Sequence, residues 1–254
     1  MSKILTIAGQ RGGTGKSVTA LNLATSLALL EKNTLLIDCD PQRSTTHWCG
    51  IKNADYACNI ASVLSAKVKF IDAVVKTELR YLTIMPAGFG LFQVAGKLAK
   101  LSENETLLRL FLKDVEKEYD YVIIDSPSSY GFLNTMAMTA ADWLLVCMSI
   151  PQSAAVDFFD LLRCIKYIRT FHHIPLKIAG LLFNRCETKE EIQSFLDYQK
   201  LPDAKELVFN TFIPSDDKIR KSTDLKIPAA LHDIKGPAAS AYLNLAKEIH
   251  FFFN

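Results

Sequence analysis

A glycine-rich loop that ends in a lysine and a serine holds the residue types best suited to chemistry in this sequence. The segment GQRGGTGKS spans residues 9–17. Glycines let backbone N–H groups turn toward an anion, because no Cβ stands in the way. A lysine ammonium can reach the β- and γ-phosphates of a nucleotide, and a serine hydroxyl can ligate Mg²⁺. The loop therefore predicts a nucleotide-phosphate site with Lys16 and Ser17 as its polar side chains.

The segments on either side of the loop are those that a phosphate site needs. The apolar run from Ile4 to Ala8 predicts a strand, and residues 18–30 predict a helix. The helix N-terminus adds unpaired N–H donors and a positive dipole end. Arg11 is a second cation beside Lys16 at that end, and a bound polyanion would relieve their repulsion. Gln10 replaces the glycine of the standard pattern G-x-x-x-x-G-K-[ST], so the loop is a variant.

Two further predicted strands end in acids. Residues 34–40 form an apolar run that ends in Asp38 and Asp40, and residues 120–125 form another that ends in Asp125. Ligands of open α/β sheets bind beyond the carboxyl ends of the strands. Alternate residues point to opposite faces, so one carboxylate of the first pair faces the nucleotide crevice. Asp125, followed by Ser-Pro, is typical of an acid that contacts the Mg²⁺ shell through water.

The order of elements predicts an α/β fold, a mostly parallel sheet covered by helices on both faces. The strands are near-continuously apolar and alternate with helical patterns, and no linker divides the chain, so we expect a single domain over residues 1–254. Further strands are expected at 81–85, 142–149, 177–183 and 207–213. Helices are expected at 59–65, 70–76, 91–101, 105–118, 153–172, 189–200 and 238–252.

Composition excludes several classes of protein. The 254 residues carry a net charge of +2, so nucleic-acid binding would depend on a local basic patch. The six cysteines form no C-x-x-C pair and no cluster with histidine, which favours reduced thiols in a cytosolic protein over a zinc site. No apolar run approaches the ~18 residues of a membrane span, so we expect no stable membrane insertion.

Four segments together resemble the ParA/MinD family of deviant-Walker P-loop ATPases, and more closely the ParA/Soj partition ATPases. They are RGGTGKS at 11–17, DCDPQ at 38–42, YVIIDSP at 121–127, and the C-terminal FIP at 212–214 with residues 236–249. The resemblance covers essentially the whole chain. It implies slow Mg²⁺-dependent ATP hydrolysis, an ATP-dependent homodimer, non-specific DNA binding in plasmid or chromosome partition, and a ParB-like partner that activates hydrolysis. The implied location is cytoplasmic, on the nucleoid in the ATP-bound state.

The resemblance also implies residue roles. Asp40 would orient the attacking water, with Lys16 and Arg11 as the other catalytic residues, while Asp38 and Asp125 would lie at the Mg²⁺ shell with Ser17. Asn184 and the segment Pro214 to Asp216 would lie at the adenine. The nucleotide-binding loop residues implied are Arg11, Gly12, Gly13, Thr14, Gly15, Lys16, Ser17 and Val18.

The sequence departs from the family pattern at two positions. Arg11 stands where relatives have a signature lysine that reaches the phosphates of the partner's ATP. Arginine keeps the charge and can contact a phosphate in bidentate fashion. Ser128 stands where relatives usually have a second proline after the acidic strand, and we expect this change to loosen the loop after Asp125.

The site of DNA binding and the cargo stay open. Candidate DNA contacts are Arg220, Lys221 and Lys218, from a stretch at 215–236 that also holds four aspartates, together with Arg163. A MinD-like membrane ATPase would use its last helix, but the predicted helix at 238–252 is no basic amphipathic helix. An ATPase that positions a protein cargo is the other alternative. An iron–sulphur reductase or a small-molecule kinase or ligase has less support, because cluster cysteines and an acceptor site are not evident.

Overall fold

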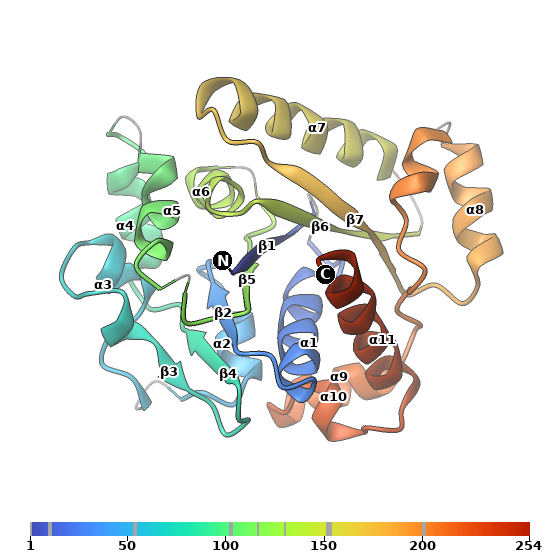
Figure 1. The fold of residues 1–254 in the computed structure, drawn as a ribbon, viewed down its shortest axis with the longest axis horizontal. Coiled ribbons are helices and arrows are strands. Elements are labelled where there is room, and N and C mark those ends of the chain that lie inside the picture. The colour runs from blue at the N-terminus through green and yellow to red at the C-terminus, as the bar shows by residue number, and fades with distance from the viewer. Residues whose placement is uncertain are drawn as a thin grey trace.

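A twisted seven-stranded sheet forms the centre of the molecule (Figure 1). The computed structural model describes residues 2–9, 12–52, 55–101, 104–115, 117–129, 131–150, 154–199 and 202–254, the side chains of 154–157, 202 and 203 excepted. The strand order is β3-β4-β2-β5-β1-β6-β7, and only β3 pairs antiparallel with its neighbour. The strands are β1 (Lys3–Ala8), β2 (Thr34–Asp38), β3 (Val75–Lys76), β4 (Leu82–Met85), β5 (Tyr121–Asp125), β6 (Trp143–Ser149) and β7 (Lys177–Asn184). The predicted mostly parallel sheet is confirmed.

The strand register brings the acid-bearing strand ends together. β5 lies between β1 and β2, and Asp38 at the end of β2 pairs in register with Asp125 at the end of β5. Every residue of β2 and of β5 is buried, because helices cover the sheet on both faces. The polar ends of these strands therefore meet at one edge of an otherwise apolar sheet, beside the start of the loop that follows β1.

Helices cover the two faces in separate groups, each with its own buried apolar cluster (Figure 1). On one face lie α1 (Lys16–Leu29) and α11 (Pro237–Phe252), which pack against each other, with α9 (Asp217–Leu225) and α10 (Ala229–His232) beside them. The last helix thus packs on the core. The other face is covered by α3 (Ile60–Leu64), α4 (Leu91–Leu98), α5 (Leu107–Leu112), α6 (Phe132–Ala140), α7 (Ala154–Phe171) and α8 (Lys189–Tyr198).

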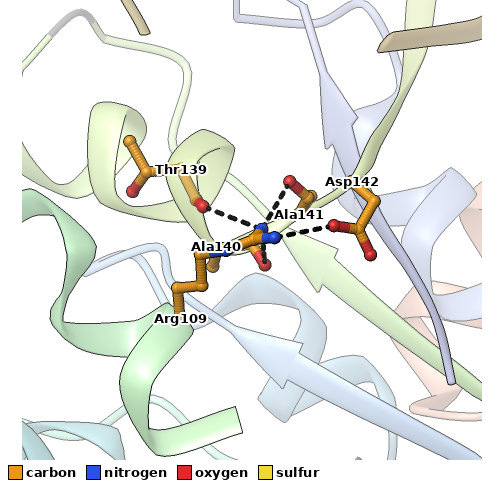
Figure 2. Close-up of polar contacts among 5 residues, drawn as sticks. All are labelled: Arg109, Thr139, Ala140, Ala141 and Asp142. Carbon is orange, nitrogen blue, oxygen red and sulfur yellow. Dashed lines mark hydrogen bonds and ion pairs between the residues drawn. The ribbon is translucent and has the colours of Figure 1, made fainter. Parts of the chain in front are cut away.

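Arg109 joins two of the covering helices on the second face to the start of a strand (Figure 2). Its guanidinium donates from α5 to the carbonyls of Thr139, Ala140 and Ala141 at the end of α6, at 3.4, 3.4 and 3.1 Å. It also forms a 2.9 Å ion pair with Asp142, immediately before β6. The last carbonyls of a helix lack partners within the helix, so a cation there stabilises its end. α6 is the helix that follows the β5 loop, and Arg109 fixes its far end.

One predicted strand and one predicted helix are wrong. Residues 207–213 form no strand and pair with β7 through two isolated bridges, at Val208 and at Ile213. The ladder is interrupted between these bridges because the N–H groups of Asn210 and Thr211 donate to the Glu248 carboxylate, at 2.7 and 3.0 Å. The expected helix at 70–76 is a short 3₁₀ turn at Ile71–Ala73 followed by β3.

Several helices differ from the expected pattern in length or were not expected. The helix expected at 105–118 is a 3₁₀ turn at Asn104–Thr106 followed by α5. Its apolar residues pack on the core: Leu107, Leu108, Phe111, Leu112 and Val115. No prediction covered α2 (Ser44–Trp48), α6, α9 or α10. Another 3₁₀ segment spans Pro202–Leu207. All six cysteines are unpaired, in agreement with the prediction of free thiols. Within the residues described, no helix is both long and apolar enough to span a membrane.

Candidate nucleotide-binding site

The loop between β1 and α1 has the backbone that its glycines predict. Gly13 and Gly15 have φ angles of 84° and 88°, in the left-handed region that other residues adopt with strain. A Cβ on Gly15 would also lie 2.9 Å from Asn184 Nδ2. Helix α1 begins directly after the loop, at Lys16. Gln10 and Arg11 lie outside the described residues, so the predicted role of Arg11 stays a prediction.

Asn184 fastens the loop to the sheet. It is the last residue of β7 and only 4% exposed, and its Nδ2 donates to the Thr14 carbonyl at 2.8 Å. Ile213 bridges to Asn184, which places the adjoining Pro214 near the same end of β7. The predicted adenine-side residues Asn184 and Pro214 are therefore neighbours, and the Asn184 amide contacts the loop backbone.

Asp216 has a structural role at the start of α9. One carboxylate oxygen accepts from the Lys218 N–H at 2.8 Å, and the other accepts from the Ala238 N–H at 3.3 Å. Such a side-chain cap satisfies N–H groups that the first helical turn leaves free. Because both oxygens have donors, the side chain joins the starts of α9 and α11.

The Lys16 ammonium is buried near the carboxyl ends of β2 and β5. The residue is 5% exposed, and Nζ donates to Ser128 Oγ at 2.9 Å. Burial lowers the pKa of Lys16, while the acidic groups of Cys147, Asp125 and Asp40 act in the opposite direction. The ammonium therefore lies among the predicted catalytic and metal-site acids, where a bound phosphate would find a poorly hydrated cation.

Asp38 is fully buried, and its carboxylate accepts hydrogen bonds from residues that follow β2. Its carboxylate accepts from the N–H of Asp40 at 3.0 Å, and from the N–H and hydroxyl of Thr46 at 2.8 and 2.7 Å. Burial raises the pKa of Asp38 to about 6, against the effect of these hydrogen bonds. The carboxylate thus fixes the turn that carries Asp40.

Asp125 is fully buried and has fewer donors. One oxygen accepts from the Thr45 hydroxyl, while Oδ1 has no hydrogen-bond partner among the described residues. Burial, followed by the nearby charge of Asp38, raises the pKa of Asp125 to about 8, and the Thr45 and Ser17 hydroxyls oppose this rise. A buried carboxylate oxygen without a donor is costly, so this atom is suited to a cation or its water.

The arrangement fits Mg²⁺ held jointly with a nucleotide. No group of three or more His, Cys, Asp or Glu side chains in the described part of the chain could hold a metal ion by itself. Mg²⁺ commonly keeps several waters and takes one or two protein oxygens together with phosphate oxygens. Asp125 Oδ1 and the Ser17 hydroxyl are such oxygens, whereas the Asp38 oxygens already have donors.

Asp40 lies beyond the end of β2 and is half-buried. Its Oδ1 accepts from the Gln42 N–H at 2.8 Å, which stabilises the turn through Pro41. Its carboxylate lies close enough to favour the charged form of Lys16. The structure therefore brings Asp40, Lys16 and Asp125 to one edge of the sheet, as the sequence predicts.

The four predicted DNA-contacting residues do not form one patch in a single chain. Arg220 and Lys221 are exposed on α9, where Lys218 forms an ion pair with Asp233. Arg163 is 81% exposed on α7 and forms a 2.7 Å ion pair with Asp160. The two helices lie on opposite faces of the sheet (Figure 1). Of these cations, Arg220 and Lys221 lie together.

Sequence patterns missed the hydroxyls that hold the acids. Thr45 and Thr46 lie in α2 and donate to Asp125 and Asp38. Ser128, predicted only as a departure that loosens its loop, contacts Lys16. The sequence does show two consecutive threonines starting five residues after Asp40, which could have suggested hydroxyl donors. Which acids they contact depends on the strand order, which no local pattern shows.

The buried acids predict a pH dependence of stability. An acid whose pKa is higher in the folded chain binds more protons there, so stability is lost as the pH rises through the folded pKa. The midpoint of thermal unfolding of the nucleotide-free chain should therefore fall between about pH 5 and pH 8. Asp125→Asn should flatten this fall, and Asp224→Asn, at an exposed position, should not. An equal fall in the Asp125→Asn chain would exclude Asp125 as its source.

The fold and the site together define a P-loop nucleotide-binding fold. The sheet is mostly parallel, and a glycine loop precedes its first helix, which starts with a lysine and a serine. Acids end both β2 and β5. A sequence model of a family described as an AAA domain matches residues 2–178. The chromosome partitioning protein ParA of Myxococcus xanthus is 32% identical, over 98% of this chain and 88% of that protein. The sporulation initiation inhibitor protein Soj of Bacillus subtilis is 31% identical, over 98% of each.

The solved structures show the same fold. The septum site-determining protein MinD of Pyrococcus horikoshii, complexed with Mg-ADP, superposes with a TM-score of 0.81 at 23% identity, over 98% of this chain and 96% of that one. The chain therefore belongs to the ParA/Soj branch of the ParA/MinD family of P-loop ATPases. ATP and Mg²⁺ are cofactors that fit this family.

Proposed function

We propose that this chain is a Mg²⁺-dependent ATPase of the ParA type, in which residues 1–254 act as one domain. The observation that carries the proposal is the buried Lys16 ammonium beside Asp125, whose Oδ1 has no donor among the described residues. A nucleotide phosphate with its Mg²⁺ satisfies both groups at once. The two curated relatives named above, a ParA and a Soj, support the partition role.

Each protein group has a distinct task in this proposal. The loop backbone and Lys16 bind and orient the phosphates, while Ser17 and Asp125 hold Mg²⁺. The metal supplies charge stabilisation on the phosphate oxygens. Asp40 orients the attacking water, and Asp38 fixes the turn on which Asp40 lies. Asn184 keeps the loop in place through Thr14.

We further propose that ATP favours a homodimer, with Arg11 reaching the partner's nucleotide, and that the dimer binds DNA without sequence preference. A two-fold dimer doubles the small basic patch of Arg220 and Lys221, so nucleotide can switch DNA binding without reshaping the patch. A ParB-like partner then stimulates hydrolysis and releases the DNA. Nucleoid association in the ATP state follows from this scheme.

The test is binding to unrelated DNA duplexes, measured by fluorescence anisotropy at several salt concentrations with ATP, ADP and no nucleotide. Affinity should appear with ATP and fall with a log–log slope of roughly −0.9 per phosphate contact. Arg220→Ala or Lys221→Ala should weaken binding to all duplexes alike and flatten the slope by about one unit, or about two when both subunits contribute. Lys218→Ala, whose ammonium pairs with Asp233, is the matched control and should have a smaller effect.

Two outcomes would redirect the proposal. An ATP-bound chain that does not bind DNA at low salt but sediments with anionic vesicles is a MinD-like membrane ATPase. An ATP-bound dimer that binds neither DNA nor vesicles would support the alternative in which the ATPase positions a protein cargo. Either result would contradict DNA binding and leave the ATP site in place.

A further inference from the structure

The hydrogen bond between Lys16 and Ser128 joins the phosphate-binding loop to the loop after β5. Lys16 Nζ donates to Ser128 Oγ at 2.9 Å, across 112 residues of sequence. Lys16 is almost fully buried and Ser128 is half-buried. A buried ammonium depends on protein acceptors because it has little access to water. The Ser128 hydroxyl accepts such a hydrogen bond from the Lys16 ammonium in the nucleotide-free chain.

The chain presents Ser128 to Lys16 from a firmly attached segment. The Ser126 hydroxyl donates to the Ile7 carbonyl at 2.7 Å, which ties the segment to β1. The Pro127 carbonyl accepts from Asn134 Nδ2 at 2.9 Å, which ties it to α6. Ser128 follows immediately, and its neighbour Ser129 is exposed. The position of the Ser128 hydroxyl is therefore set by contacts with two secondary-structure elements.

We propose that Ser128 is a positioning residue that binds the Lys16 ammonium in the nucleotide-free chain and competes with the nucleotide phosphates for it. This inference rests on the proposed function, in which Lys16 binds those phosphates. An ammonium has three N–H donors, and hydrogen bonds to an anionic phosphate oxygen are stronger than those to a neutral hydroxyl. A phosphate oxygen that accepts the N–H now donated to Ser128 displaces the hydroxyl, and nucleotide affinity is reduced by the stability of the bond that is broken.

Competition of this kind has a signature that a purely structural role lacks. Removal of the hydroxyl destabilises only the nucleotide-free state, where it accepts from Lys16. Thermal stability without nucleotide then falls while affinity for nucleotide rises. A side chain that merely supports the fold of the site would lower both when it is truncated.

The experiment measures ATP affinity by calorimetry and thermal unfolding without nucleotide, in the full chain with Mg²⁺. Ser128→Ala should bind ATP roughly three- to tenfold more tightly, and its nucleotide-free form should unfold at a lower temperature. Ser128→Cys, whose sulfur is a weak acceptor, should change in the same direction. Ser128→Thr keeps a hydroxyl and should retain the original affinity. Ser129→Ala, at the exposed neighbouring position, should change neither quantity.

Lys16→Ala and the double variant Lys16→Ala with Ser128→Ala separate the two proposals. If both lose ATP binding alike, the gain from Ser128→Ala acts through Lys16. If Lys16→Ala loses ATP binding, but Ser128→Ala and Ser128→Cys bind ATP no more tightly than the unaltered chain, the proposed role of Ser128 is wrong and the phosphate site stands. Unimpaired binding by Lys16→Ala would instead overturn the proposed phosphate site.

Discussion

Lys16→Ala is expected to weaken ATP binding by about 100-fold or more. Hydrogen bonds to charged groups contribute about 1.5–3 kcal/mol each, and about 1.4 kcal/mol corresponds to a tenfold change in affinity. The Lys16 ammonium is buried at the start of α1, so a phosphate there is weakly screened by water. Loss of one such cation removes at least one strong contact and its long-range attraction. Equilibrium titration with ATP and Mg²⁺ measures the effect.

The matched control for this variant is Lys100→Ala. Lys100 is exposed on the surface beyond α4, so its removal leaves the site and the core unchanged. It should bind ATP as the unaltered chain does. Thermal unfolding of Lys16→Ala shows whether it is folded under the assay conditions. A folded Lys16→Ala chain with undiminished ATP affinity would contradict the phosphate-binding role of Lys16.

Asp40→Ala is expected to keep ATP binding and to lower turnover by about 100-fold or more. Orientation and deprotonation of the attacking water contribute to the chemical step, where general-base catalysis is typically worth about 10²–10⁴. Asp40 is half-buried at the edge of the sheet, and its carboxylate favours the charged form of Lys16. Phosphate release under saturating ATP measures turnover, and titration measures binding.

Asp40→Asn separates the chemical role of Asp40 from its role in the turn. The asparagine oxygen can still accept from the Gln42 N–H, which Asp40 Oδ1 does at 2.8 Å. Turnover should therefore stay low in Asp40→Asn even though the turn is retained. Recovery of turnover in Asp40→Asn would show that Asp40 acts through the turn rather than on water.

Local sequence patterns predicted those parts of the site that local patterns control. The glycines, Lys16 and Ser17 belong to one loop whose spacing has a direct physical meaning, and the loop has the expected positive φ angles. The apolar runs before Asp38 and Asp125 form strands because a parallel sheet covered on both faces buries nearly every residue. Their pairing follows from the strand order, which brings the two acids into register.

Contacts between distant segments could not be predicted in the same way. Residues 207–213 have the composition of a strand, yet Glu248 on α11 binds two of the N–H groups that a strand would need. The contact of the Asn184 amide with the Thr14 carbonyl was not predicted, because it depends on β7 ending beside the loop, and the expected place of Asn184 near the adenine stays a prediction. The partners of Thr45, Thr46 and Ser128 depend on the same three-dimensional arrangement. Single-sequence patterns carry no information on such pairs.

Equilibrium binding of ATP to the purified, unaltered protein, with Mg²⁺ and with a chelator in its place, tests the central claim most directly. The account predicts saturable binding of one ATP per chain, competition by ADP, and weaker binding without Mg²⁺, because Asp125 and Ser17 hold the ion together with the phosphates. Absence of saturable ATP binding at millimolar nucleotide with Mg²⁺ would contradict the assignment of the loop, Lys16 and Asp125 to a nucleotide site.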